Sequence, residues 1–382
     1  MSNLRILFLS ENTVDGGHGY DMWAGMYPQS DYMEVINFTE EYKKFGKSKF
    51  ESDVIDKIGK HKISNVFIAL GTSYIIDINF LRDINMLCKL IMVFPDTEHN
   101  FEMDRYYAQC ADLVWLLGPA GVHLYTLYGV NCVWTHGFDN KRYFKQSLEK
   151  DIDVSFIGGI NRSNRKEYID FLLDNGIKVE LYGDGTVNGK VSNTQKNEVV
   201  SRSRINLNFT GVENGERNIY TRLKQAKGRP MEVSMSGSFM LSEDAPRIED
   251  MFVIGSEIDI FKTKEELLDK INYYLEHDSI REDIAKNAYN RAIKDYETVN
   301  SFKTIIYRLK NINHIEKTYF MDKEFAQKFV SIRFYYMTKF FLSGKFKASI
   351  DELRCITKYK NIRLKNFYFD IPRGIFHFIK AR

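Results

Sequence analysis

Two glycines followed by three cations form one candidate site for chemistry. Gly158 and Gly159 directly follow the apolar run DVSFI, and Arg162, Arg165 and Lys166 come at the start of a predicted helix. Adjacent glycines let a backbone approach an anion closely, and the free N–H groups of a helix start attract negative charge. Because the helix dipole alone would favour acids here, the cations indicate a phosphate bound between them, with a solvated basic turn as the alternative.

A second glycine pair, Gly16 and Gly17, follows the apolar run LRILFLS and precedes a predicted helix. This loop could bind an anion in the same way, or it could be an ordinary strand-to-helix turn. Neither loop is a P-loop, and no G-x-G-x-x-G follows a predicted strand. Kinase, P-loop ATPase and simple dehydrogenase functions therefore lose their main support.

Several acidic residues and one histidine could act on a polar substrate. Glu232 opens a short predicted helix, and its carboxylate could accept two hydrogen bonds from a vicinal diol, although an exposed Glu in a first helical turn is equally ordinary. Asp96, His99 and Glu102 lie just past the apolar run LIMVF. Carboxylates near His99 could tune it as a base, and the alternative is a loop histidine that caps a turn.

Metal-dependent and disulfide-bonded classes find little support. Asp151-Ile-Asp153 has the spelling of a metal-binding Asp-x-Asp, but it stands at the entrance of a core strand, so we predict no metal site and no cofactor. The four cysteines are far apart without C-x2-C spacing, which predicts free thiols in a reducing compartment.

Short apolar runs alternate with amphipathic stretches over the first 300 residues. Near-continuous apolar runs of strand length are typical of parallel strands buried on both faces, and alternation with helices predicts doubly wound α/β domains. A polar stretch at 143–151 separates two such patterns. Ligands of such domains bind at the carboxyl ends of the strands. The expected strands are 4–9, 65–70, 90–94, 113–117, 153–157, 178–181, 205–209, 238–241 and 251–254, and the expected helices include 50–60, 80–88, 264–276, 280–296 and 299–309.

Charge divides the 382-residue chain in two. Residues 301–382 hold 18 basic and 6 acidic side chains, so they carry +12 while residues 1–300 carry −9, and they also hold 18 of the 54 aromatic residues. Two basic, aromatic helices are expected there, the second from Phe346 to about Thr357. They could lie on an anionic bilayer, form the core of a docked helical subdomain, or bind a protein acceptor; nucleic acid is the least favoured partner.

The second half of the chain resembles a known family. The pieces DVSFIGGINRSNRKEYIDFLLDNGIKVELYGDG, SRSRINLNFTG and RPMEVSMSGSFMLSEDAPRIEDMFVIGSEIDIFKTKEELLDKINYYL, followed by REDIAKNAYNRAIKDY, resemble in order and spacing the nucleotide-sugar domain of group-1 glycosyltransferases, in particular the CgeB-like branch. FPDTEHNFEMDRYYAQCADLVWLLGPAGVHLYTLYGVN and HGFDNKRYF are similar, more loosely, to the end of that branch's first domain. The match spans roughly 91–306 and leaves out the tail.

The resemblance implies a GT-B fold, with two Rossmann-like doubly wound domains facing a cleft and a C-terminal basic helical extension. We therefore expect an acceptor-side domain at 1–142, a nucleotide-sugar domain at 143–300, a crossover region at 301–320 and the tail at 321–382.

The resemblance also assigns roles to residues. Glu232 matches the acid that holds the donor ribose, and Arg229 the first residue of the branch's Arg-x-x-Glu form. The chain departs from the common Glu-x7-Glu pattern, because Lys224 stands eight residues before Glu232. The implied donor-binding residues are Gly16, Gly17, Gly158, Gly159, Arg162, Arg229, Glu232, Ser236 and Gly237, and the candidate catalytic residues are His99, Asp96, Arg165 and Lys166.

The resemblance implies a retaining hexosyltransferase that uses a nucleotide-diphosphate sugar, and the cations of the glycine loop predict that it needs no metal. The expected acceptor is a surface glycan, a lipid-linked glycan or a protein, and a homo-oligomer is compatible with the sequence. A non-catalytic sugar-nucleotide-binding or scaffold protein on the same fold is the alternative. No window of about 18 apolar residues occurs, so we expect a cytoplasmic protein that could also bind peripherally to a membrane.

Overall fold

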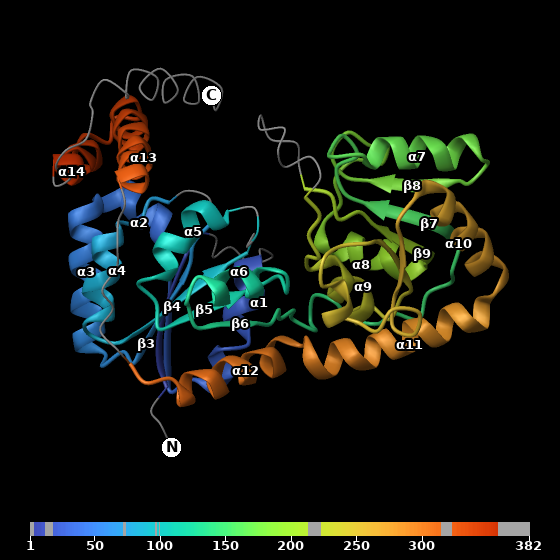
Figure 1. The fold of residues 1–382 in the computed structure, drawn as a ribbon, viewed down its shortest axis with the longest axis horizontal. Helices are drawn as coiled ribbons and strands as arrows, with labels where there is room; N and C mark the ends of the chain where they lie inside the picture. Colours follow the sequence, from blue (N-terminus) through green and yellow to red (C-terminus); the bar gives the residue numbers. More distant parts are fainter. Residues whose placement is uncertain are drawn as a thin grey trace.

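The computed structural model describes residues 4–11, 18–71, 74–95, 98, 100–212, 223–314 and 323–357. They form two α/β domains side by side, with a helical hairpin on the outer side of the first domain (Figure 1). Each domain contains one parallel sheet with helices around it. This arrangement confirms the predicted fold class.

The first domain is built on a six-stranded sheet of order β2-β1-β3-β4-β5-β6. Every pairing is parallel, and β3, β4 and β5 are almost completely buried, which is why their sequences read as continuous apolar runs. The strands are β1 (Arg5–Ser10), β2 (Tyr32–Asn37), β3 (Asn65–Ala69), β4 (Lys89–Phe94), β5 (Leu113–Leu116) and β6 (Cys132–Trp134), and the helices are α1 (His18–Ala24), α2 (Phe38–Phe45), α3 (Lys47–Lys60), α4 (Ile78–Asn85), α5 (Phe101–Ala108) and α6 (Gly121–Leu127).

The second domain carries a five-stranded parallel sheet of order β11-β10-β9-β7-β8. Its first strand, β7, lies between β8 and β9, so the chain order reverses there. Ligands of doubly wound sheets bind at such a switch point, outside the carboxyl ends of the strands. The strands are β7 (Ile152–Ile157), β8 (Val179–Tyr182), β9 (Ser203–Asn208), β10 (Met240–Glu243) and β11 (Asp259–Phe261), and the helices are α7 (Arg165–Asp174), α8 (Asn193–Arg202), α9 (Arg229–Met235), α10 (Lys264–Glu276) and α11 (Asp278–Asp295).

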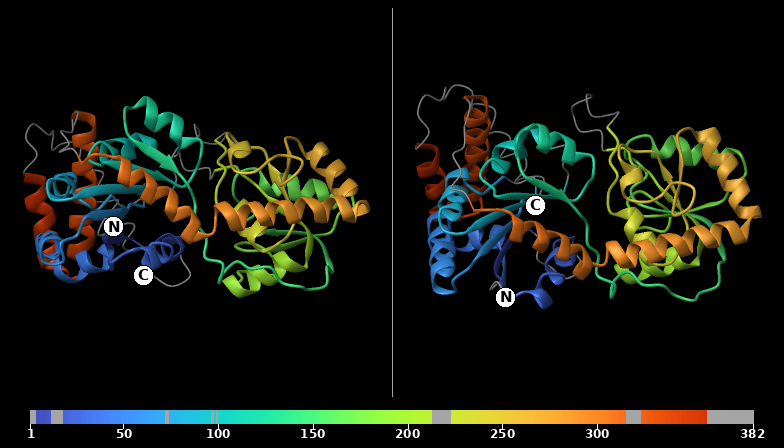
Figure 2. Two further views of the ribbon diagram at one scale, coloured as in Figure 1. Left: turned by 90° about the horizontal axis from the view of Figure 1, so that it is seen from below. Right: turned by 60° about the horizontal axis from the view of Figure 1, so that its bottom comes forward.

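A long helical connection returns the chain to the first domain. Helix α11 lies along the second domain, and α12 (Thr298–Asn311) continues under the first (Figures 1 and 2). Phe302, Ile305 and Leu309 of α12 are buried in the same cluster as Trp115 of β5. The first sheet is therefore completed by a helix that follows the second domain in sequence.

Most predicted elements are present, with four differences. The expected strand 251–254 is wrong: Met251 and Phe252 are buried, but they follow a 3-10 turn (Ile248–Asp250), and Ile254 forms only an isolated bridge with Ile258. Strands β2, β6 and β11 were not predicted, because β2 is half-exposed at the sheet edge and β6 and β11 have only three residues each. The four cysteines are free, as expected.

The basic tail begins as a hairpin of α13 (Lys323–Leu342) and α14 (Phe346–Thr357). Phe325, Phe329 and Phe340 of α13 are buried in the main core of the first domain, and the Phe325 ring stacks on Tyr106 of α5 at a centroid distance of 4.0 Å. Residues 323–357 thus form the docked subdomain that was one of the alternatives, while 358–382 lie outside the described residues.

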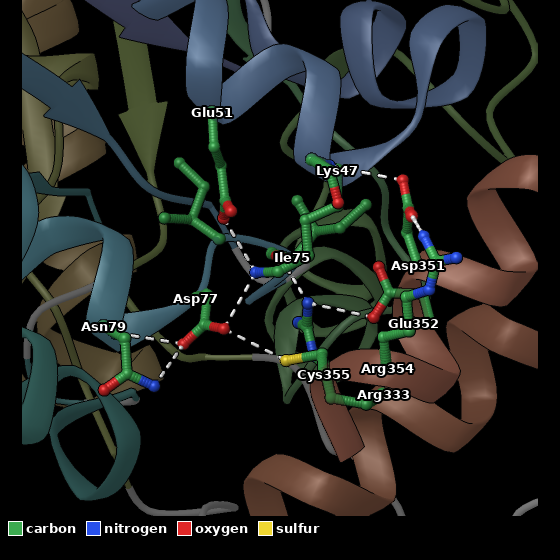
Figure 3. Close-up of polar contacts among 12 residues, drawn as sticks. Lys47, Glu51, Ile75, Asp77, Asn79, Arg333, Asp351, Glu352, Arg354 and Cys355 are labelled. Carbon is green, nitrogen blue, oxygen red and sulfur yellow. Dashed lines mark hydrogen bonds and ion pairs between the residues drawn. The ribbon is translucent and has the colours of Figure 1, made fainter. Parts of the chain in front are cut away.

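Charged groups are buried where the hairpin meets the first domain (Figure 3). Arg333 of α13 pairs with Glu352 of α14 at 3.3 Å, and both side chains are at most 1% exposed. Lys47 of α3 pairs with Asp77 at 2.9 Å, and the Cys355 thiol of α14 donates to Asp77 at 3.0 Å. The interface is therefore specified by matched polar groups as well as by aromatic packing.

Candidate active site

The loops after three neighbouring strands meet at the switch point of the second sheet. The Gly158 N–H donates to the Tyr182 carbonyl at 2.7 Å. A Cβ on Gly183, whose φ is +127°, would lie 2.5 Å from the Gly158 carbonyl oxygen, and a Cβ on Gly211 would collide with Ser163. Only glycine permits these approaches, so the loop that follows β7 is held against the ends of β8 and β9.

The predicted phosphate cations do not share one position. Arg165, half-buried at the start of α7, donates to the Gly159 carbonyl at 3.0 Å and lies 5.7 Å from the Phe156 ring centre. Arg162 is exposed on the loop beside Gly159. Lys166 is exposed and pairs with Asp170 one turn along α7 at 2.6 Å. Arg165 is thus built into the glycine loop, whereas Lys166 lies on the outer surface of the helix.

Glu232 is a buried carboxylate at the centre of a polar cluster. It stands in the first turn of α9 and is 6% exposed. Arg229 Nη1 donates to its Oε2 at 2.6 Å, Lys196 Nζ of α8 to the same oxygen at 3.1 Å, and the Tyr143 hydroxyl to Oε1 at 3.2 Å. Arg229 also donates to the Ile157 carbonyl at 3.1 Å, which ties the carboxylate to the end of β7 beside the glycine loop.

Burial shifts the pKa values of the groups around Glu232. It lowers the pKa of Lys196, which Glu232 partly restores, and it raises the pKa of Tyr143 together with the neighbouring Glu232 charge. Two cations therefore surround one carboxylate, and the cluster has an excess of positive charge. An anionic ligand is favoured beside such a group.

Ser236 and Gly237 lie at the opposite end of α9 from Arg229. The Ser236 hydroxyl donates to the Asn197 side chain of α8 at 2.6 Å. Gly237 has a φ of +70°, and a Cβ there would meet Lys145 at 2.8 Å. These two predicted donor-binding residues anchor α9 to its neighbours and are not brought to the glycine loop.

Lys224, the departure from the Glu-x7-Glu pattern, has a specific partner. It pairs with Oε1 of Glu243, a fully buried carboxylate at the end of β10, at 3.0 Å. The other oxygen of Glu243 accepts from the Thr210 N–H at 2.9 Å and the Gly211 N–H at 3.3 Å. The lysine thus neutralises a carboxylate that fixes the carboxyl end of β9.

The two domains touch across the ends of their sheets. Gln225, beside the end of β9, donates to Glu98 in the loop after β4 at 2.6 Å. This loop contains two of the predicted catalytic residues, Asp96 and His99, which lie outside the described residues, as do Gly16 and Gly17. The loop after β4 therefore faces the second domain at Glu98.

A buried ion pair links the first domain to the segment that crosses to the second. Asp21 of α1 accepts from Arg142 at 2.5 Å and from the Asp139 N–H at 3.2 Å. Burial raises the pKa of Asp21 to about 6, against the opposing charge of Arg142. Protonation of this carboxyl would remove a charge pair at the domain junction.

Tyr143, Lys196 and the Asp21–Arg142 pair carry no sequence signal that could have identified them. Lys196 stands in the polar stretch NTQKNEVV, which reads as an exposed helix face. The capping box of Ser192 and Gln195 fixes where α8 starts, and hence which side Lys196 faces, but its partner Glu232 is 36 residues away.

The Asp-x-Asp spelling at 151–153 lies at the amino end of β7. Asp151 forms a two-point ion pair with Arg202, and Asp153 lies 3.6 Å from Arg204. Within the described part of the chain, no three His, Cys, Asp or Glu side chains are grouped so that they could hold a metal ion.

Comparisons with known proteins follow the same division of the chain. Residues 162–306 match the profile of a family described as "Glycosyl transferase-like". A search of curated protein sequences found no match. Among solved structures, HepE of Anabaena in complex with UDP superposes with a TM-score of 0.59 and 13% identity over 81% of this chain and 100% of HepE. HepE with UDP-glucose gives a TM-score of 0.58 at 13% identity and the same coverage.

A sucrose-phosphate synthase from Thermosynechococcus elongatus superposes with a TM-score of 0.57 at 10% identity, over 80% of this chain and 99% of that enzyme. At these identities the likeness shows the GT-B fold. Residues 162–306 of the second domain match a glycosyltransferase family, and together with this fold the match indicates a glycosyltransferase, in enzyme class EC 2.4.

Proposed function

We propose that this protein transfers a sugar from a nucleotide-diphosphate sugar to an acceptor hydroxyl, with retention of configuration and without a metal, as a CgeB-like member of group 1. The observation that carries the proposal is the buried Glu232, which Arg229 ties to the end of β7 at the switch point. A carboxylate held there can accept hydrogen bonds from the two hydroxyls of a ribose.

The donor diphosphate is proposed to lie on the glycine loop after β7. The N–H groups at the start of α7 and the Arg165 guanidinium would face it, while Gly158 and Gly159 leave room for close approach. Arg162 is exposed on the same loop, and a rotation of its side chain would bring it toward a ligand. We propose that Gly16 and Gly17 of the first domain also contact the donor diphosphate, and that Asp96 and His99 act on the acceptor side.

The chemistry follows from where charge develops. Breaking the glycosyl–phosphate bond leaves positive charge on the sugar and negative charge on the departing phosphate. Fixed cations and N–H donors stabilise that leaving group, and one such donor lowers the activation barrier by about 3 kcal/mol. In this proposal Arg165 supplies most of that stabilisation, because it is held on the loop, whereas Lys166 contributes less from its pair with Asp170.

The acceptor is proposed to be a glycan, lipid-linked or polymeric, or a protein, reached from the cytoplasm at or near a membrane surface. None of the helices in the described part of the chain has the length and apolar character needed to cross a bilayer. The second candidate is a non-catalytic sugar-nucleotide-binding protein. It is favoured by Lys224, which pairs with Glu243 where related enzymes place a carboxylate on the donor sugar.

The test is release of nucleoside diphosphate by the purified protein from a panel of nucleotide sugars, starting with uridine donors because HepE was crystallised with UDP-glucose. We expect slow hydrolysis of one donor, a loss of at least 100-fold in Arg165→Ala, and a loss of less than about tenfold in Lys166→Ala. Binding of a donor without any release would favour the non-catalytic alternative. Equal release by wild type and Arg165→Ala would remove the proposed site.

A further inference from the structure

Helix α14 has two different faces. Its inner face, with Ala348, Glu352 and Cys355, is buried against α13 and the first domain. Its outer face carries a stripe of three apolar side chains, Phe346, Ile350 and Leu353, which are 58%, 49% and 47% exposed. Spacings of four and three residues place them on one side of the helix.

The stripe extends onto the end of α13. Phe341 is 59% exposed, and its ring contacts Phe346 edge-on at a centroid distance of 5.5 Å. These four side chains form a continuous apolar surface, which we call the hairpin face. A contiguous apolar surface of this kind marks a site of interaction, unlike single exposed apolar side chains.

The exposed charges on α14 and in the turn before it are basic. Lys345, Lys347 and Arg354 flank it and are exposed. The two acidic residues of α14, Asp351 and Glu352, are at most 3% exposed, because Asp351 accepts from the Ser48 N–H and Glu352 pairs with Arg333. The fold thus turns the acids of α14 inward and leaves the bases beside the apolar stripe.

This charge pattern selects among the occupants. The remaining 25 residues of the chain, 358–382, carry seven Lys or Arg and one Asp, so their charge does not complement the basic rim. An anionic surface does complement it, and Phe and Leu between lysines are the side chains that insert at the boundary between lipid headgroups and acyl chains.

We propose that the hairpin face docks on an anionic lipid bilayer and binds it peripherally. In this proposal the inner face of α14 belongs to the docked subdomain, and its outer face binds the bilayer, so both interpretations of the tail apply. If the proposed function holds, docking would keep the first domain at the lipid surface, because α13 packs on α5 of that domain through Phe325 and Tyr106.

The test is flotation of the full-length protein with vesicles of phosphatidylcholine alone and of phosphatidylcholine with phosphatidylglycerol. We expect flotation only with the anionic vesicles, weakened by high salt. Lys345→Gln/Lys347→Gln should lower partitioning about 25-fold, since each lysine near an anionic bilayer contributes about fivefold. Phe346→Ser/Ile350→Ser should lower it by about tenfold or more.

Matched variants on the second domain control for loss of charge and of apolar surface. Lys178→Gln/Lys190→Gln removes two lysines that are 85% and 76% exposed, and Val187→Ser removes an apolar side chain that is 99% exposed. Both should float like wild type. Nucleoside diphosphate release from the same samples reports on the proposed function separately, so that failure of one is not mistaken for failure of the other.

Three results would overturn the proposal. The first is absent flotation, equal flotation on uncharged vesicles, or hairpin-face variants that float like wild type. The second is a dimer in light scattering that the hairpin-face variants dissociate, which would assign this face to a second copy of the chain. The third is strong hydrogen-exchange protection of 346–353 that is lost when 358–382 is removed, which would assign the face to the chain's own end.

Discussion

Replacement of Arg333 by Met should destabilise the first domain by about 3–5 kcal/mol. Arg333 and Glu352 are both almost completely buried (Figure 3), and removal of one partner of such a pair leaves the other charge without compensation. Arg333 also donates to the carbonyl groups of Tyr74 and Ile75 in the first domain, so its loss removes two further buried hydrogen bonds.

The two single variants should differ in their pH dependence. Burial raises the pKa of Glu352 even beside Arg333. Without Arg333 the carboxyl can avoid the cost of a buried, unpaired charge by taking up a proton. The destabilisation in Arg333→Met should therefore shrink as the pH falls from 7 toward 5. Arg333 cannot lose its proton, so the cost of Glu352→Leu should persist. The double variant Arg333→Met/Glu352→Leu should recover at least about 2 kcal/mol relative to the sum of the singles.

Tryptophan fluorescence during urea unfolding measures this effect selectively. All three tryptophans, Trp23, Trp115 and Trp134, lie in the first 150 residues, in α1, β5 and β6. The transition therefore reports on the domain that the hairpin covers. Arg354→Met is the matched control, because Arg354 is 72% exposed, and loss of its pair with Asp351 should change stability by less than about 1 kcal/mol.

An unchanged fluorescence transition in both Arg333→Met and Glu352→Leu would refute this reasoning. It would mean that the hairpin unfolds independently, and that Phe325 and Phe329 do not contribute to the stability of the first domain. If the losses of unfolding free energy in the two single variants simply add in the double variant, the two side chains do not interact as an ion pair. That result would not affect the argument from aromatic packing.

Three further predictions concern single side chains. Because burial raises the pKa of Asp21 to about 6 in the folded protein, the folded protein holds this proton more tightly than the unfolded chain, so wild-type stability should fall by about 2 kcal/mol relative to Asp21→Asn as the pH rises from 4 to 7; a difference independent of pH in urea titrations would contradict the shift. Lys224→Glu restores the Glu-x7-Glu spelling but places a like charge against buried Glu243, so it should lower the melting temperature of the second domain and reduce donor hydrolysis, and unimpaired hydrolysis would count against the geometry of this pair. Phe325→Ala should cost about 3–5 kcal/mol in the fluorescence transition, and a cost below 1 kcal/mol would place Phe325 outside the core.

The sequence was sufficient for the framework of both domains. Buried parallel strands such as β3 and β4 have nearly continuous apolar sequences. This pattern located the strands, and hence the loops after the first strand of each domain. The same rule failed at 251–254. An apolar run indicates that residues are buried but does not show that they form a β-strand, and Met251 and Phe252 are buried in a turn. Edge strand β2 was missed because its residues are half-exposed.

The candidate site was only partly accessible to such reasoning. A glycine pair with cations is a local pattern, but the partners of Glu232 come from α8 and from the interdomain segment, 36 and 89 residues away. Their meeting depends on how α8 packs behind the sheet. The tail shows the same limit: its composition allowed a bilayer-bound or a docked helix, and only the burial of Asp351 and Glu352 separates the two faces of α14.

Truncation before the hairpin would be a poor test of membrane binding. A chain that ends at residue 320 would expose the core side chains that Phe325, Phe329 and Phe340 cover. Loss of flotation would then follow from unfolding of the first domain as readily as from loss of a lipid-binding surface. Surface substitutions on the hairpin face avoid this ambiguity.

The most direct test of the central claim is the affinity of UDP compared with 2′,3′-dideoxy-UDP, measured by calorimetry on wild type and Glu232→Gln. If Glu232 holds the ribose of the donor, wild type should prefer UDP by about tenfold or more, since hydrogen bonds to a charged group contribute about 1.5–3 kcal/mol. Glu232→Gln should reduce this preference to less than about threefold, while Glu276→Gln, at an exposed position, should retain it. An equal preference in wild type and Glu232→Gln would contradict the proposed donor site.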